Sequence, residues 1–163
     1  MATILDSGER RKFETGAVRD IQEGKGRCDL LPLDIIGMFM GDNILVDLSM
    51  FQHSGDIHYL VNVLRDCPVQ FDFESYPNMF LEVSKHFEDG CNKYGEDNWR
   101  KGIPAKCYVD SAVRHYLKHM RGDTDERHDR AFVWNILCAI WTCEHMPNLN
   151  SYLKPKPEET VEH

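Results

Sequence analysis

Apolar positions recur at helical spacing through the second half of the chain. A helix is predicted from about 78 to 94, with a core face formed by Phe80, Val83, Phe87, Cys91 and Tyr94. A second helix is predicted from about 107 to 121, with a core face formed by Val109, Val113, Tyr116, Leu117 and Met120. We expect the two apolar faces to share one core.

The last predicted helix, RAFVWNILCAIWTC at about 130 to 143, is apolar almost all round. Such a helix lies in the middle of a bundle or at a subunit interface. Its apolar surface is more than a small bundle covers alone, which predicts oligomers. His128, Asn135 and Thr142 are spaced by seven and share one stripe. A buried Asn135 needs a partner, because an unpaired amide costs about 1–3 kcal/mol.

The N-terminal half gives weaker patterns. A helix is predicted from LLPLDIIGMFMG, with Pro32 near its first turn, and another from about 56 to 66, followed by a connection at 67–77. Residues 1–30 are predicted to be an extended or looped arm, since the stretch FETGAVRDIQEGKGRCD carries three glycines among basic and acidic residues. No convincing alternating strand pattern occurs. Residues 33–77 are an uncertain insert: a lid, an interface or a small second lobe. The prediction is one all-α helical bundle over residues 1–150, with a flexible tail at 151–163.

Composition excludes several classes of protein. The formal net charge of -8 argues against a duplex nucleic-acid binder, although an acidic chain can bind phosphates through a divalent metal. No apolar run is long enough for a membrane span, and the N-terminus lacks a signal core. The six cysteines include no C-x-x-C pair, so we do not expect a zinc site. We expect reduced thiols and a cytoplasmic protein, in the host cytoplasm if a phage encodes it.

Acidic side chains offer one possible chemistry. Glu82 and Asp110 flank the core faces of two predicted helices, where facing carboxylates could hold Mg²⁺. The alternative is that both face solvent. Asp110, Arg114 and Lys118 form a polar stripe, each four residues from the last, and His115 points away from it if the helix is regular. Arg114 and Lys118 could bind phosphate, or Arg114 could form a surface salt bridge with Asp110. His128 is interpreted as a buried hydrogen-bond anchor, and Asp129 as a helix cap or a ligand.

The segment KYGEDNWRKG offers a second chemistry. Trp99 could stack on a base, Asn98 could bind a base or sugar edge, and Lys93 and Lys101 could hold phosphates. The alternative is that Trp99 fills the core while the lysines are solvated.

Three strings carry a family resemblance: FETGAVRDIQEGKGRCDLLP, LEVSKHFEDGCNKYGEDNWRKGIP and YVDSAVRHYLKHMRGDTDERHDRAFVWNILCAIW. Together they resemble the phage and bacterial dATP/dGTP diphosphohydrolase N-terminal-domain family, which is similar to MazG-like all-α nucleoside triphosphate pyrophosphohydrolases. The resemblance covers about 13–32 and 78–142. It implies hydrolysis of deoxynucleoside triphosphates to the monophosphate and pyrophosphate, with Mg²⁺ or alternatively Mn²⁺, in a homodimer or homotetramer.

The resemblance also implies site residues. Glu82 and Asp110 would be catalytic and would bind the metal, with Asp129 as a further metal ligand. The nucleotide would be bound by Arg27, Asp29, Lys93, Asn98, Trp99, Lys101, Arg114 and His128. The chain departs from the MazG-like pattern, because Lys85 and Val113 stand where E-x-x-E and E-x-x-D would place carboxylates. Glu88, Asp89 or Asp129 would have to complete the cluster.

Two other functions fit the same residues. A nucleotide-binding module without turnover is favoured by the incomplete acidic motif. An interaction protein, for example a phage factor that binds a host protein, would use the apolar last helix as its interface.

Overall fold

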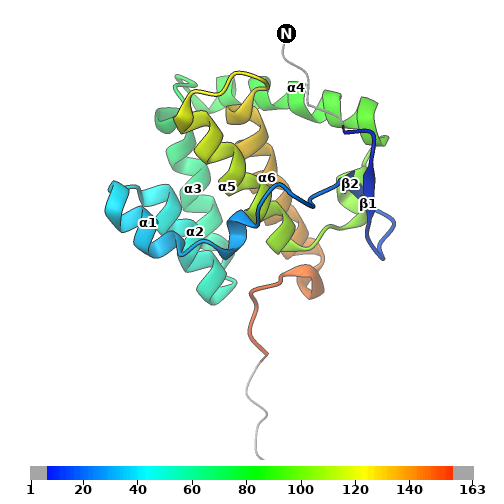
Figure 1. The fold of residues 1–163 in the computed structure, drawn as a ribbon, viewed down its shortest axis with the longest axis horizontal. Helices are drawn as coiled ribbons and strands as arrows, with labels where there is room; N and C mark the ends of the chain where they lie inside the picture. The colour runs from blue at the N-terminus through cyan, green and yellow to red at the C-terminus, as the bar shows by residue number, and fades with distance from the viewer. Residues whose placement is uncertain (1–6, 156–163) are drawn as a thin grey trace, which may run out of the picture.

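The chain is all-α, apart from one short hairpin, in a computed structural model that describes residues 7–155 (Figure 1). Within that range the elements in chain order are β1 (Arg10–Lys12), β2 (Val18–Asp20), a 3-10 turn (Cys28–Leu30), α1 (Leu33–Met40), α2 (Asn43–Ser54), α3 (Ile57–Gln70), α4 (Tyr76–Tyr94), a 3-10 turn (Asn98–Lys101), α5 (Ala105–Arg121), α6 (His128–His145) and a 3-10 turn (Pro147–Leu149).

Helix α6 lies at the centre of the bundle, packed against α3, α4 and most extensively α5 (Figure 1). Phe132, Val133 and Ile136 are fully or almost fully buried in the monomer. The prediction of a central helix is therefore confirmed. Four apolar side chains of this helix, Trp134, Leu137, Ile140 and Trp141, are only partly buried, so it keeps some apolar surface outside its contacts with the other helices.

The predicted insert at 33–77 contributes three helices to the common core. Asp42 and Asp56 cap α2 and α3 by accepting hydrogen bonds from the backbone N–H groups of Leu45 and His58. The predicted connection at 67–77 is largely wrong, because α3 continues to Gln70 and α4 begins at Tyr76. Pro68 lies in the last turn of α3, where its missing N–H removes only one helical hydrogen bond.

The core face of α4 differs from the predicted one. Val83 is buried as predicted and Met79 is buried as well, whereas Phe80 is 43% exposed and Cys91 is also exposed. Ser75 caps the helix by accepting from Asn78 N–H. At the start of the helix the buried position is Met79 and not Phe80. This shift of one residue moves the side chain by about 100° around the helix axis.

The predicted N-terminal arm contains the only strands among residues 7–155, and the expectation of no strand was wrong there. Strands β1 and β2 pair antiparallel, with Arg11 opposite Arg19. The turn between them includes Gly16 at φ +87°, a conformation that glycine adopts without steric cost. Each strand has three residues, too few for an alternating pattern. Residues 1–6 of the arm lie outside the described residues.

The start of the predicted tail packs against the bundle. Asn150 donates to the carbonyl of Gly55, and Tyr152 packs edge-on against Phe51 at 5.3 Å. Residues 156–163 of the predicted tail lie outside the described range. No helix between residues 7 and 155 has the length and apolar character that crossing a bilayer requires.

Candidate functional site

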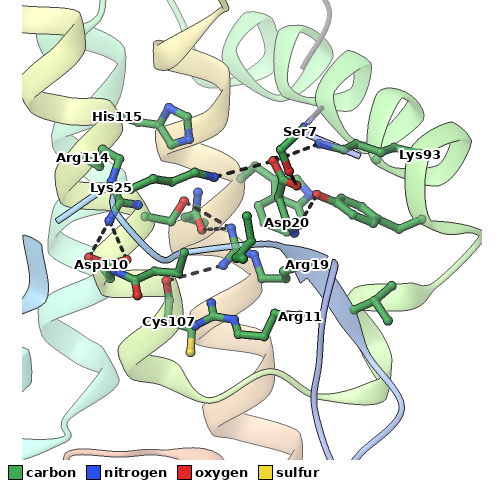
Figure 2. A pocket seen from close by; sticks show the side chains of 18 of the residues that line it. Ser7, Arg11, Arg19, Asp20, Lys25, Lys93, Cys107, Asp110, Arg114 and His115 are labelled. Atoms are coloured by element: carbon green, nitrogen blue, oxygen red, sulfur yellow. Dashed lines mark hydrogen bonds and ion pairs between the residues drawn. The ribbon is translucent and has the colours of Figure 1, made fainter. Parts of the chain in front are cut away.

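A cavity of about 480 Å³ opens between the β-hairpin, α4, α5 and α6. Charged side chains from these elements point into it (Figure 2). Six lining side chains are basic and come from five separate segments: Arg11, Arg19, Lys25, Lys93, Arg114 and Lys118. Three lining carboxylates accompany them: Asp20, Asp110 and Glu126. An acidic protein therefore gathers an excess of positive charge at this cavity.

Two of these cations have unused hydrogen-bond donors. The Nε atoms of Arg11 and Arg114 are buried and have no acceptor within the described part of the chain. A buried N–H without a partner costs free energy. An anionic oxygen entering the cavity could remove that cost.

The hairpin that supplies part of the cavity wall is fixed by Asn98. The Asn98 side chain accepts a hydrogen bond from Val18 N–H and donates one to Val18 C=O, both at 2.8 Å. The Tyr94 hydroxyl accepts from the backbone N–H of Asp20 at 3.1 Å. Asn98 was predicted to bind nucleotide. It lines the cavity, but its amide is engaged with the β2 backbone.

Arg19 reaches from β2 across the floor of the cavity. Its guanidinium lies over the rings of Tyr108 and Trp134, at 5.5 and 5.6 Å from their centroids. It also donates to Ser111 Oγ at 3.2 Å and to Asn135 Oδ1 at 3.4 Å. The predicted need of Asn135 for a partner is thus met, since its Nδ2 also donates to a backbone carbonyl.

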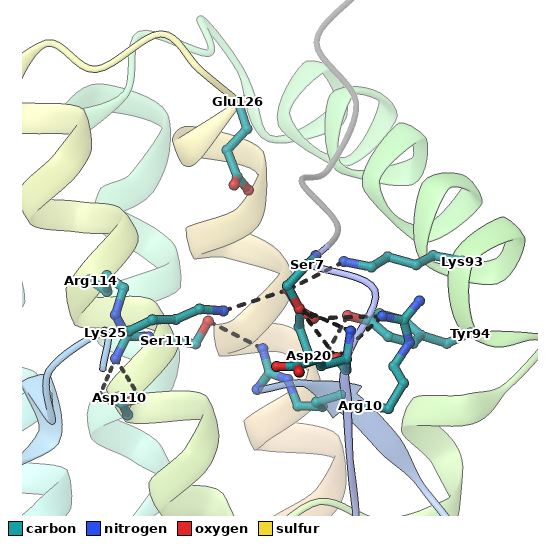
Figure 3. Close-up of polar contacts among 12 residues, drawn as sticks. Ser7, Arg10, Asp20, Lys25, Lys93, Tyr94, Asp110, Ser111, Arg114 and Glu126 are labelled. Atoms are coloured by element: carbon teal, nitrogen blue, oxygen red, sulfur yellow. Dashed lines mark hydrogen bonds and ion pairs between the residues drawn. The ribbon is translucent and has the colours of Figure 1, made fainter. Parts of the chain in front are cut away.

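Asp20 links three parts of the cavity rim (Figure 3). Its carboxylate accepts from the Ser7 hydroxyl and lies 3.6 Å from Lys25 Nζ and 3.8 Å from Lys93 Nζ. Burial acts to raise the pKa of Asp20, but the Ser7 hydrogen bond and the Lys93 charge outweigh it, so the pKa is lowered. Lys93, predicted to hold phosphate, does line the cavity.

Asp110 and Arg114 form a buried pair at the opposite wall. Arg114 Nη2 donates to both carboxylate oxygens, at 2.8 and 2.7 Å, and to Gly26 C=O at 2.6 Å. The carboxylate also accepts from Cys28 N–H at 2.7 Å. The pair therefore ties the segment after the hairpin to α5.

Arg27 and Asp29 pair with each other beside that segment, at 2.8 and 2.7 Å. The Asp29 carboxylate is buried, while the Arg27 side chain is 46% exposed. Burial acts to raise the pKa of Asp29, but the hydrogen bonds from Arg27 lower it overall. Neither residue is among those that line the cavity.

Glu82 and Asp129 belong to a separate ionic cluster where α4 meets α6. Glu82 accepts from Arg130, lies 3.7 Å from Arg127 and accepts from Lys85 at 3.1 Å. The hydrogen bonds from Arg130 and Lys85 lower the pKa of Glu82. Asp129 accepts from Arg127 at 3.0 and 2.9 Å. Neither carboxylate lines the cavity, so the structure does not bring Glu82 and Asp129 together with Asp110.

Trp99 and Lys101 also lie away from the cavity lining. Trp99 packs edge-on against Phe87 and Trp141, with ring centroids at 5.6 and 5.1 Å. This arrangement is the alternative in which Trp99 fills the core. Lys101 is exposed at the end of the same 3-10 turn, Asn98–Lys101.

Histidines line one end of the cavity. Burial and the charges of Arg19 and Arg130 lower the pKa of His86 to about 4. His115 Nδ1 lies 2.8 Å from His128 Nδ1, and His128 Nε2 lies 2.6 Å from Asp125 Oδ1. His128 is fully buried as a hydrogen-bond anchor. Burial, and after it the charge of His128, lowers the pKa of His115 well below its usual value.

Sequence reasoning missed much of this lining. The missed residues are those of the hairpin and its connection (Arg11, Arg19, Asp20 and Lys25), together with His115 and Glu126. Lys118, expected with Arg114 to bind phosphate, does line the cavity. The basic residues of the first 30 positions were a visible signal, but Arg19 contacts Cys107, Ser111 and Asn135, which lie 88 to 116 positions away. His115 was expected to point away from the polar stripe, whereas it lines the cavity beside Arg114 and Lys118.

Comparison with known proteins gives one match. A family model described as "dATP/dGTP diphosphohydrolase, N-terminal" matches residues 64–151, which is more than half of the chain. The matched range covers α4, α5 and α6, and so most of the cavity wall outside the hairpin. No curated protein matches, and no solved structure matches.

Proposed function

The chain belongs to the dATP/dGTP diphosphohydrolase N-terminal family, and from this membership we propose that it hydrolyses deoxynucleoside triphosphates of the dATP/dGTP class. The products are the monophosphate and pyrophosphate. The cavity between the hairpin, α4, α5 and α6 is the proposed site. The single observation that carries the proposal is the set of six lining cations in a chain of net charge -8.

The cavity suits a triphosphate in size and charge. A volume of about 480 Å³ falls within the range of small-molecule sites. The Nζ atoms of Lys25 and Lys93 lie 3.6 and 3.8 Å from Asp20, while Arg114 and Lys118 reach the cavity from α5. Cations fixed on rigid elements can stabilise negative charge that grows on phosphate oxygens in the transition state. Trp134, which also lines the cavity, offers an aromatic surface for the base.

The proposed reaction adds water across the α–β phosphate bridge. The water oxygen bonds to the α-phosphorus, and the bond from the α-phosphorus to the bridging oxygen breaks. Pyrophosphate leaves with the bridging oxygen, and the proton of the attacking water goes to a base. Lysine and arginine side chains hold the phosphates during this step, so removing one should weaken both binding and turnover.

The carboxylates expected to hold Mg²⁺ do not fit that role as they stand. Glu82, Asp110 and Asp129 each accept hydrogen bonds from arginine. Within residues 7–155, none of them belongs to a group of three or more side chains able to share one ion. Mg²⁺ or Mn²⁺ therefore enters the proposal only as a counterion carried by the nucleotide, and no step depends on it.

A nucleotide panel tests the proposal. Each dNTP and NTP is incubated with the chain, with and without EDTA, and the products are separated by chromatography. Lys118→Met should raise KM and lower kcat, because it removes a cavity cation. Lys106→Met is the matched control, since Lys106 is an exposed lysine on the same helix outside the cavity. Equal effects of the two substitutions would mean that the reaction does not take place in this cavity.

A nucleotide-binding module without turnover is the second candidate. The arginine pairing of Glu82, Asp110 and Asp129 favours it, because it occupies the three carboxylates that were expected to bind a catalytic metal. It predicts stabilisation by dATP or dGTP, of size RT ln(1 + [L]/Kd), with no product. Oligomerisation remains part of both proposals, and light scattering after size exclusion measures it.

A further inference from the structure

Three side chains with metal-binding atoms converge where α5 meets the start of α6. His115 comes from α5, His128 is the first residue of α6, and Glu126 lies in the connection between them. One ligand atom of each lies within 4.8 Å of the other two. His115 and Glu126 line the cavity, and His128 is buried behind them.

The spacing of the ligand atoms suits one ion. His115 Nδ1 lies 2.8 Å from His128 Nδ1 and 3.9 Å from Glu126 Oε1. An ion about 2.1 Å from each ligand separates adjacent ligand atoms by about 3.4 Å in a tetrahedron and about 3.0 Å in an octahedron. The observed distances lie on both sides of these values, so side-chain shifts of less than about 1 Å would complete the geometry.

Asp125 orients one of the imidazoles. A carboxylate accepts hydrogen bonds, so the contact of 2.6 Å places the hydrogen of neutral His128 on Nε2. His128 Nδ1 then presents its lone pair toward His115 and Glu126. Metal-binding histidines usually donate their other N–H to a carboxylate in this way, which fixes the tautomer and the ring orientation.

We propose that His115, Glu126 and His128 bind a divalent transition metal ion of the Co²⁺, Zn²⁺ or Mn²⁺ type. Two imidazoles and one carboxylate leave open coordination positions, and the exposed side of the group faces the cavity. When the ion binds, the hydrogen on His115 Nδ1 moves to Nε2 of the same ring, so that the Nδ1 lone pairs of both histidines face the ion. The affinity of these three residues for the ion does not depend on the proposed function. A role for the ion in binding triphosphate oxygens would rest on that function.

A second group shares His128 and lies on its other side. Asp123, Asp125 and His128 also have ligand atoms within 4.8 Å of one another. That group would use Nε2 of His128, and none of its three members lines the cavity. Asp123 is already paired with Arg121. The group containing Glu126 is therefore the better site, and the two can be separated by substitution.

Titration with Co²⁺ alone tests the site. The full chain is freed of metal with EDTA, the EDTA is removed, and Co²⁺ is added while heat and visible absorption are recorded. We expect saturation at one Co²⁺ per chain, with no thiolate charge-transfer band. Glu126→Gln and His115→Ala should each weaken binding about tenfold or more. His53→Ala, which removes an exposed histidine on α2, should leave it unchanged.

Several results would overturn the proposal. These are the absence of saturable Co²⁺ binding, the presence of a thiolate band, or an unchanged Co²⁺ affinity in Glu126→Gln. Because Glu126→Gln is nearly isosteric, it tests the site even if His115→Ala does not fold. Loss of binding in Asp123→Asn with retention in Glu126→Gln would assign the ion to the second group. Because no nucleotide is present, a chain that binds Co²⁺ without hydrolysing dATP refutes only the proposed function.

Discussion

Replacing Asp110 by asparagine should destabilise the protein strongly. The Asp110 side chain is 6% exposed and the Arg114 side chain is 14% exposed. The carboxylate accepts two hydrogen bonds from Arg114 and one from Cys28 N–H, all at 2.7 to 2.8 Å. Asp110→Asn leaves the guanidinium charge buried without its counter-charge, which costs about 3–5 kcal/mol. In a chain of this size we expect Tm to fall by about 10 °C.

Chemical denaturation with urea, followed by circular dichroism, measures this cost. Glu88→Gln is the control, because Glu88 is exposed on α4 and should change stability by less than about 0.5 kcal/mol. The double variant Asp110→Asn with Arg114→Met should lose less than the sum of the single changes, since the unpaired charge is gone. If Asp110 were instead a strained metal ligand, Asp110→Asn would be neutral or stabilising without metal. That result would refute a structural role for Asp110.

Three further outcomes are expected. The free energy of unfolding should fall as pH drops from about 6.5 to about 4, because His86 in the unfolded chain then takes up a proton that His86 in the folded chain does not. In urea titrations at several pH values, His86→Gln should remove the part of this loss that His86 causes, on the order of 3 kcal/mol. Asn98→Ala should speed amide exchange at Val18 and cost about 1–3 kcal/mol, as measured by hydrogen exchange and by denaturation. Gly55→Ala should lower Tm, because Gly55 has φ +69° and an added Cβ would lie 2.8 Å from the backbone of Leu153. An unchanged Tm would contradict the packing of the C-terminal segment against Gly55.

The long helices could be predicted from periodicity because their apolar faces are regular over many turns. The predicted spans of α4, α5 and α6 each fall within two residues of the observed ends. The hairpin could not be predicted in this way, because its strands have three residues each. Val18 is held by Asn98, 80 positions away, and no local pattern encodes that contact.

The candidate site was less predictable because its charges meet only in the folded chain. Lys93 and Arg114 were predicted to bind nucleotide and do line the cavity. For Asp110, the sequence left a salt bridge with Arg114 as an alternative, and the structure contains that pair. For Glu82, the decisive partner is Arg130, which lies 48 positions away on α6. Spacing along one helix could not reveal it.

Hydrolysis of dATP in water enriched in ¹⁸O tests the central claim most directly. The chain is incubated with dATP, and the products are separated and weighed by mass spectrometry. Attack at the α-phosphorus predicts dAMP that carries one ¹⁸O atom and pyrophosphate that carries none. Label in pyrophosphate or orthophosphate, or no product with chain and substrate at equal concentrations, would contradict the proposed hydrolysis.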